Sequence, residues 1–154
     1  MRQYLEEAKQ ELKRVDHLVY VSLKYTRTVD VIKSVLERLI AAYDFIVMEL
    51  LEYIKEQKKI DKFPQTPLER VELIQNTFQD HIELNEALNF YLKLRKLSRA
   101  PYGKREEFRR HVTMIAKLDN WETEEISIDV VKEYFDNTKK FVDQIYVMIE
   151  GEKE

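Results

Sequence analysis

Basic side chains are concentrated in one short part of the chain, between residues 93 and 117. This segment holds nine Lys or Arg residues and two acidic residues, so its net charge is +7. Residues 118–154 hold four basic and eleven acidic residues, a net charge of −7, and the whole chain carries −3. A dense group of cations is the electrostatic feature that attracts phosphate groups. The residues that we expect to contact such a ligand are Lys93, Arg95, Lys96, Arg99, Tyr102, Lys104, Arg109 and Arg110.

Three interpretations of this basic segment are open at the level of sequence. In the first, it packs beside an acidic C-terminal helix and the charges pair across the surface, each pair contributing about 0–1 kcal/mol. In the second, it binds RNA or another polyanion, and the nearby rings of Tyr91, Tyr102 and Phe108 stack on bases. In the third, it binds an acidic partner protein.

Two residues of the segment also have the side chains that acid–base chemistry on a phosphate requires. Arg105 and His111 are separated by five residues. An Arg and a His at this spacing, in a helical bundle with a basic pocket, resemble the signature of HEPN domains. The resemblance implies a small, often dimeric all-helical module, many members of which are metal-independent ribonucleases.

The same resemblance implies a catalytic role for each residue. His111 would transfer the proton of the RNA 2′-hydroxyl or of the leaving oxygen, and Arg105 would stabilise charge on the scissile phosphate. If the segment is helical, His111 can instead pair with Glu107, which lies one turn earlier.

The sequence lacks the residues that several other classes of functional site require. The chain has no Cys, which excludes disulfides, zinc fingers, iron–sulfur clusters and thiol nucleophiles. No His is preceded three positions earlier by Glu, so the Glu-x-x-His pattern of di-iron bundles is missing. With only two glycines there is no Gly-rich phosphate loop. We therefore expect neither a metal site nor a cofactor.

The composition favours helices to position these residues. Only two Gly and three Pro occur in 154 residues, whereas an all-β fold needs such residues at its many turns. We expect one all-α domain over residues 1–154, an up-and-down bundle of about five to six helices. Its centre is expected to hold the helices Val29–Gln57 and Ile128–Ile149, where apolar residues recur every three or four positions.

Capping residues indicate where the helices begin. A break is expected over Lys24–Asp30, where Thr26 and Thr28 can cap a new helix. The sequence Thr66-Pro67-Leu68-Glu69 is typical of a helix start, and this helix is expected to end near Phe78.

The rest of the chain is expected to be helical as well. We expect helices over residues 82–98 and 104–118, the second with Phe108, Val112 and Ile115 buried. Residues 119–127 are expected to form a polar connection, and Gly151 is expected to end the last helix.

The apolar pattern of the sequence also bears on the oligomeric state of the protein and on its location in the cell. The wide apolar stripe of the helix Val29–Gln57 favours a homodimer. No segment approaches the roughly 20 apolar residues that a membrane span requires, and residues 1–16 do not resemble a secretory signal.

We expect a cytoplasmic, non-catalytic binding or scaffold module whose basic turn engages RNA or another polyanion. The alternatives are a ribonuclease that uses Arg105 and His111, and a structural oligomerisation subunit.

Overall fold

The computed structural model of the chain describes residues 3–57 and 59–153. It is mainly helical, as expected, but it also contains a small antiparallel sheet. The helices are α1 (Gln3–His17), α2 (Leu23–Tyr25), α3 (Val29–Glu56), α4 (Pro67–Thr77), α5 (Ile82–Arg99) and α6 (Ile128–Lys153), with a π-helical turn over Leu18–Ser22. The strands are β1 (Tyr102–Arg105), β2 (Thr113–Lys117) and β3 (Thr123–Ser127), with a 3₁₀ turn over Asp119–Trp121.

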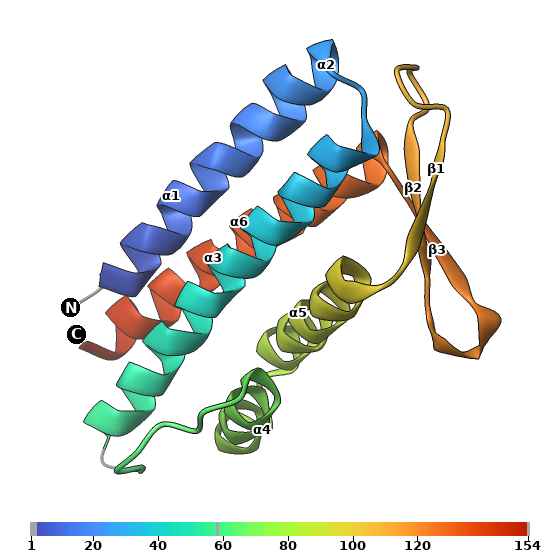
Figure 1. The fold of residues 1–154 in the computed structure, drawn as a ribbon. Coiled ribbons are helices and arrows are strands. Elements are labelled where there is room, and N and C mark those ends of the chain that lie inside the picture. The colour runs from blue at the N-terminus through green and yellow to red at the C-terminus, as the bar shows by residue number, and fades with distance from the viewer. Residues whose placement is uncertain (1–2, 58, 154) are drawn as a thin grey trace.

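The long helices lie side by side and alternate in direction (Figure 1). α1 and α3 pack closely against each other, and α6 packs along both of them. α5 lies on the other side of α3, and α4 packs against α3 and α5. The sheet lies beyond the end of α5, and β3 leads directly into α6 (Figure 1). The sheet therefore lies beside the end of the bundle at which α3 and α6 begin.

The helix starts confirm the capping predictions. The hydroxyl of Thr28 accepts a hydrogen bond from the backbone N–H of Val31 at 3.4 Å, and α3 begins at Val29. The hydroxyl of Thr66 accepts one from the N–H of Glu69 at 3.2 Å, with Pro67 in the first position of α4. In both cases the side chain satisfies an N–H that has no partner inside its own helix.

The core follows the apolar stripes that the sequence predicts. α3 carries the widest stripe, and its inward residues contact α1, α5 and α6 at once. This explains why a single helix can have apolar residues on more than one face in a bundle. Its fully buried aliphatic residues include Ile32, Leu36, Leu39, Ile46 and Leu50.

The predicted helix over residues 104–118 is wrong, and so is the all-helical description of the C-terminal third. Residues 102–127 form the meander β1-β2-β3, in which Lys104 pairs with Met114 and Met114 pairs with Ile126. Between residues 104 and 111 only Phe108 is apolar, so a helix there would have no stripe to bury. The strands instead bury alternate residues, among them Met114, Ala116 and Ile126.

Two other boundaries also differ from the predictions. The expected polar connection over residues 119–127 contains β3, whose pairing with β2 the polar composition concealed. Gly151 does not end α6, which continues to Lys153. Glycine lowers helix stability by about 1 kcal/mol but does not clash with helical geometry, so a helix already packed on the core can pass through it.

If the sheet is part of the hydrophobic core, truncating its buried face must cost as much as truncating a helix. We expect Ile126→Ala to lower the free energy of unfolding by about 2–5 kcal/mol, because Ile126 is fully buried. Thr123→Ala, at the exposed start of the same strand, should change it by less than about 0.5 kcal/mol. Urea denaturation measures both. Equal small effects would mean that the sheet does not pack on the helices.

Candidate anion-binding site

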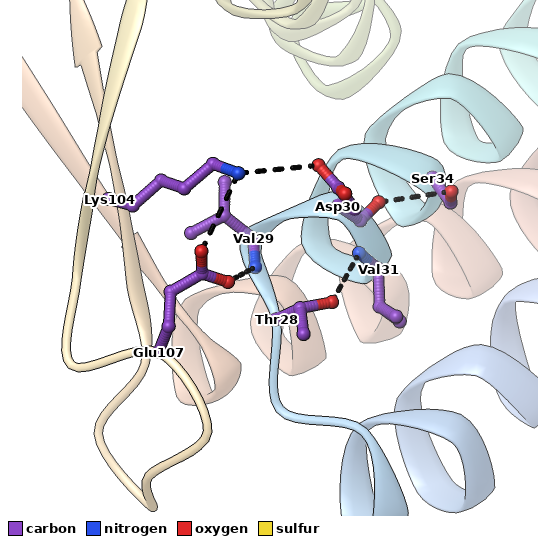
Figure 2. A network of polar contacts seen from close by, with 7 residues as sticks. All are labelled: Thr28, Val29, Asp30, Val31, Ser34, Lys104 and Glu107. Atoms are coloured by element: carbon purple, nitrogen blue, oxygen red, sulfur yellow. Dashed lines mark hydrogen bonds and ion pairs between the residues drawn. The ribbon is translucent and has the colours of Figure 1, made fainter.

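The loop between β1 and β2 caps the first turn of α3. One carboxylate oxygen of Glu107 accepts a hydrogen bond from the N–H of Val29 at 3.0 Å. The other lies 3.5 Å from the ammonium group of Lys104, which is also 3.9 Å from a carboxylate oxygen of Asp30 (Figure 2). Together with Thr28, Glu107 satisfies two N–H groups at the positive end of the helix dipole. A helix start and a loop 78 residues later are thereby joined.

Backbone contacts fix the same loop against the turn that precedes α3. The N–H of Phe108 donates a hydrogen bond to the carbonyl oxygen of Arg27 at 2.6 Å. Glu106 and Phe108 have φ angles of 55° and 66°, a left-handed conformation that residues with large side chains rarely adopt. Such a conformation persists where surrounding contacts stabilise it. Here the bonds from Val29 and to Arg27 do so, and the ring of Phe108 remains 77% exposed.

Beside this junction lies a cavity of about 530 Å³. Three segments that are far apart in the sequence line it: residues 19–27, which lead into α3, the β1–β2 loop, and the junction of β3 with α6. Its basic side chains are Lys24, Arg27, Arg110, His111 and Lys132, and its acidic side chain is Asp129. The other lining residues are Val19, Tyr20, Leu23, Ser127 and Ile128.

The positive charge of this cavity is not cancelled by ion pairs. Among the described residues, no carboxylate lies within 4.0 Å of a charged nitrogen of the five basic side chains. The ammonium group of Lys132 instead lies 5.4 Å from the ring centre of Tyr20. α6 also begins at the cavity wall, where the hydroxyl of Ser127 accepts from the N–H of Val130 at 3.3 Å. Its dipole adds positive potential at that end.

Most of the predicted polyanion-binding residues lie elsewhere, and several are paired. Lys93 lies 2.7 Å from a carboxylate oxygen of Glu124, and Arg95 lies 3.8 Å from one of Asp44. Lys104 takes part in the cap of α3, and Tyr102 is half-buried beneath the ammonium group of Lys33 at 4.7 Å. Lys96 and Arg99 on α5 and Arg109 in the loop are exposed. Of the eight predicted contacts, Arg110 lines the cavity.

The predicted catalytic pair is divided between two surfaces. The guanidinium of Arg105 forms an ion pair with Glu125 of β3, diagonally across the sheet. His111 lines the cavity, whereas Arg105 does not. The alternative pairing of His111 with Glu107 is not formed either, since Glu107 binds the N–H of Val29 and faces Lys104.

The acidic C-terminal segment neutralises only part of the basic segment, and it does so from a strand. Glu124 and Glu125 of β3, not carboxylates of α6, are the partners of Lys93 and Arg105. The ion-pairing interpretation therefore holds for basic residues of β1 and α5 that face β3. Arg110 and His111 instead face the cavity.

Sequence reasoning missed three of the cavity's five basic residues. Lys24, Arg27 and Lys132 lie outside the basic segment of residues 93–117. Lys24 and Arg27 precede that segment by more than 60 residues. A partial signal was present for Lys24 and Arg27, which lie in the predicted break before α3. Nothing in the sequence indicated that the β1–β2 loop folds back on that break.

A second polar cluster lies between α3 and α5 but is best explained as structural. The hydroxyl of Tyr91 donates to the carboxylate of Asp44, which also faces Arg95. Burial raises the pKa of the Asp44 carboxyl, and the hydrogen bond from Tyr91 and the charge of Arg95 offset this in part. Burial raises the pKa of Tyr43, whose ring stacks on that of Tyr91, to about 12. The buried ring of Tyr91 is therefore not available to stack on a base.

Comparisons with known proteins assign no family to the chain. No family model matches its sequence, and no curated protein or solved structure is significantly similar to it. Within the described residues, no three His, Asp or Glu side chains are grouped so that they could hold a metal ion. None of the described helices has the length and apolarity that crossing a membrane requires. The function must therefore be argued from the cavity itself.

The capping contact of Glu107 gives a stability prediction. We expect Glu107→Ala to lower the free energy of unfolding by about 1–2 kcal/mol, because the N–H of Val29 loses its acceptor and Lys104 loses the nearer of its two carboxylates. Glu106→Ala removes the same charge from the adjacent, exposed position and should cost less than about 0.5 kcal/mol. Chemical denaturation compares them, and similar losses would show that Glu107 does not hold the loop to α3.

Proposed function

We propose that the protein is a non-catalytic binding module that holds the phosphate groups of RNA or another polyanion in its basic cavity. The observation that carries the proposal is the convergence of five basic side chains from three separate segments on one cavity, where Asp129 is the single carboxylate among the described lining residues. Like charges repel, so this arrangement lowers stability unless an anion enters. Basic residues without a shared role would instead be spread over the surface or paired with carboxylates.

The chemistry of the cavity suits a phosphate. The guanidinium groups of Arg27 and Arg110 can each donate two parallel hydrogen bonds to phosphate oxygens. Lys24 and Lys132 supply compact positive charges, and the start of α6 supplies a favourable dipole. The exposed side chain of Arg109, which directly precedes Arg110 in the loop, adds a positive charge next to the lining residues and favours a chain of phosphates over a single one.

The two alternatives have less support. A HEPN-like ribonuclease needs Arg105 and His111 at one phosphate, but the guanidinium of Arg105 is occupied by Glu125 on the sheet. A homodimer and a purely structural oligomerisation role stay predictions, and light scattering on the purified protein would measure the oligomeric state.

Charge reversal at the cavity tests the proposal. We expect Arg110→Glu or Arg27→Glu to weaken binding of a fluorescent 12-nucleotide oligouridylate at least tenfold, since each replaces an attractive charge with a repulsive one. Affinity of the unaltered protein should also fall steeply as salt is raised. Fluorescence anisotropy at several salt concentrations measures both effects.

Lys62→Glu is the matched control, because it makes the same change of charge on an exposed residue between α3 and α4. It should leave affinity within about twofold. Binding that is absent, insensitive to salt or equally weakened by Lys62→Glu would contradict the proposal.

The ribonuclease alternative has its own test. We expect the oligouridylate to stay intact on denaturing gels after incubation with the protein in EDTA, and His111→Ala to weaken binding without any change in cleavage. Metal-independent cleavage that His111→Ala abolishes would overturn the non-catalytic assignment and restore the nuclease.

A further inference from the structure

Exposed aromatic residues lie in the segments that line the basic cavity. The ring of Tyr20 lines it and is 46% exposed, and Tyr25, 78% exposed, lies two residues before Arg27. Phe108 is 77% exposed and is held beside Arg27 by its backbone hydrogen bond. Large apolar side chains are costly to leave in water, and they mark binding surfaces where they gather.

Phe108 is the most informative of these rings because its exposure is built into the loop. Its backbone is left-handed at φ 66°, and the contacts drawn in Figure 2 hold the preceding residue, Glu107, against the start of α3. Gly and Asn adopt a left-handed conformation most readily, and a phenyl ring is usually buried. The β1–β2 loop instead holds Phe108 in this conformation with its ring in water, its backbone bonded to Arg27 and its position two residues before Arg110.

We propose that the ligand is a single-stranded nucleic acid, and that a base stacks on the ring of Phe108 while the adjoining phosphates occupy the cavity. This rests on the proposed function and narrows it, since polyanions without bases would use only the cations. Every nucleobase has a flat face, so aromatic rings beside a basic groove bind single strands with little sequence preference.

Other anionic surfaces fit this arrangement less well. A double helix keeps its bases stacked on one another, so none is free to reach Phe108. A lipid bilayer is flat and would meet the rim before its phosphates reached cations that line a cavity. An acidic protein would satisfy the charges, but it offers carboxylates in place of flat apolar rings. A single strand supplies phosphates and unpaired bases at short intervals.

The test compares two chains that differ only in their bases. Oligouridylate of 12 nucleotides and an abasic phosphodiester chain of the same length carry the same number of phosphates. We expect the unaltered protein to bind the oligouridylate about tenfold more tightly than the abasic chain. Phe108→Ala should remove most of this preference and leave affinity for the abasic chain within about twofold, whereas Phe108→Trp should retain the preference.

Trp121→Ala is the matched control. Trp121 is fully exposed, has a φ of 65° and lies in the β2–β3 turn, which Figure 1 shows at the opposite end of the sheet from the β1–β2 loop. The variant removes a ring that is even more exposed, in the same backbone conformation, and should bind both chains as the unaltered protein does. Because both aromatic side chains are exposed, unfolding midpoints should hardly change and will show that each variant is folded.

Four results would overturn the inference, and they are distinguishable from failure of the proposed function. Equal affinity for the two chains, or a preference that Phe108→Ala leaves intact, would leave a phosphate site that ignores bases. Tighter binding to an RNA duplex than to the single strand would exclude stacking. Binding of phosphatidylserine vesicles that depends on Phe108, without preference for bases, would assign the rim to a lipid surface. Loss of the proposed function itself would appear as no salt-sensitive binding of either chain.

Discussion

The contact between Glu107 and the first turn of α3 joins the β1–β2 loop to the helical bundle beside the basic cavity. α3 is the helix that contacts most of the bundle, and its first N–H groups cannot be satisfied within the helix itself. Thr28 satisfies one of them locally, as sequence patterns predict, and Glu107 satisfies another from the β1–β2 loop. Because this contact holds the loop against α3, the loop residues Arg110 and His111 lie at the same cavity as Lys24 and Arg27, which precede α3.

Ion pairing gives some basic residues of the segment 93–117 a structural role and leaves others unpaired among the described residues. Those near β3 face Glu124 or Glu125 and help to hold the sheet against the end of α5. Such partly exposed pairs contribute little each, so they orient the sheet more than they stabilise it. Those beyond residue 108 have no such partner among the described residues and face the cavity or solvent. The net charge of a segment therefore does not say which of its cations are free to bind.

The helices could be predicted and the sheet could not, for a physical reason. α3 and α6 carry apolar residues at helical spacing over many turns, and Thr28 and Thr66 mark helix starts by local hydrogen bonds. The strands are only four or five residues long, and β1 and β3 consist mainly of polar residues. Their stability comes from pairing across the sheet and from Met114 and Ile126 packing on the helices. That information is not local.

The candidate site depends on the same non-local information. In a helix, residues six positions apart are rotated by about 240° around the axis, so even the expected helix would not have placed Arg105 and His111 on one face. The loop separates them further, sending Arg105 to Glu125 and His111 to the cavity. In place of the predicted pair Arg105 and His111, the structure has a set of basic and aromatic residues from several segments, which no short sequence motif describes. A site assembled this way depends on the α3 cap, so a mutation at Glu107 should impair ligand binding without touching the ligand.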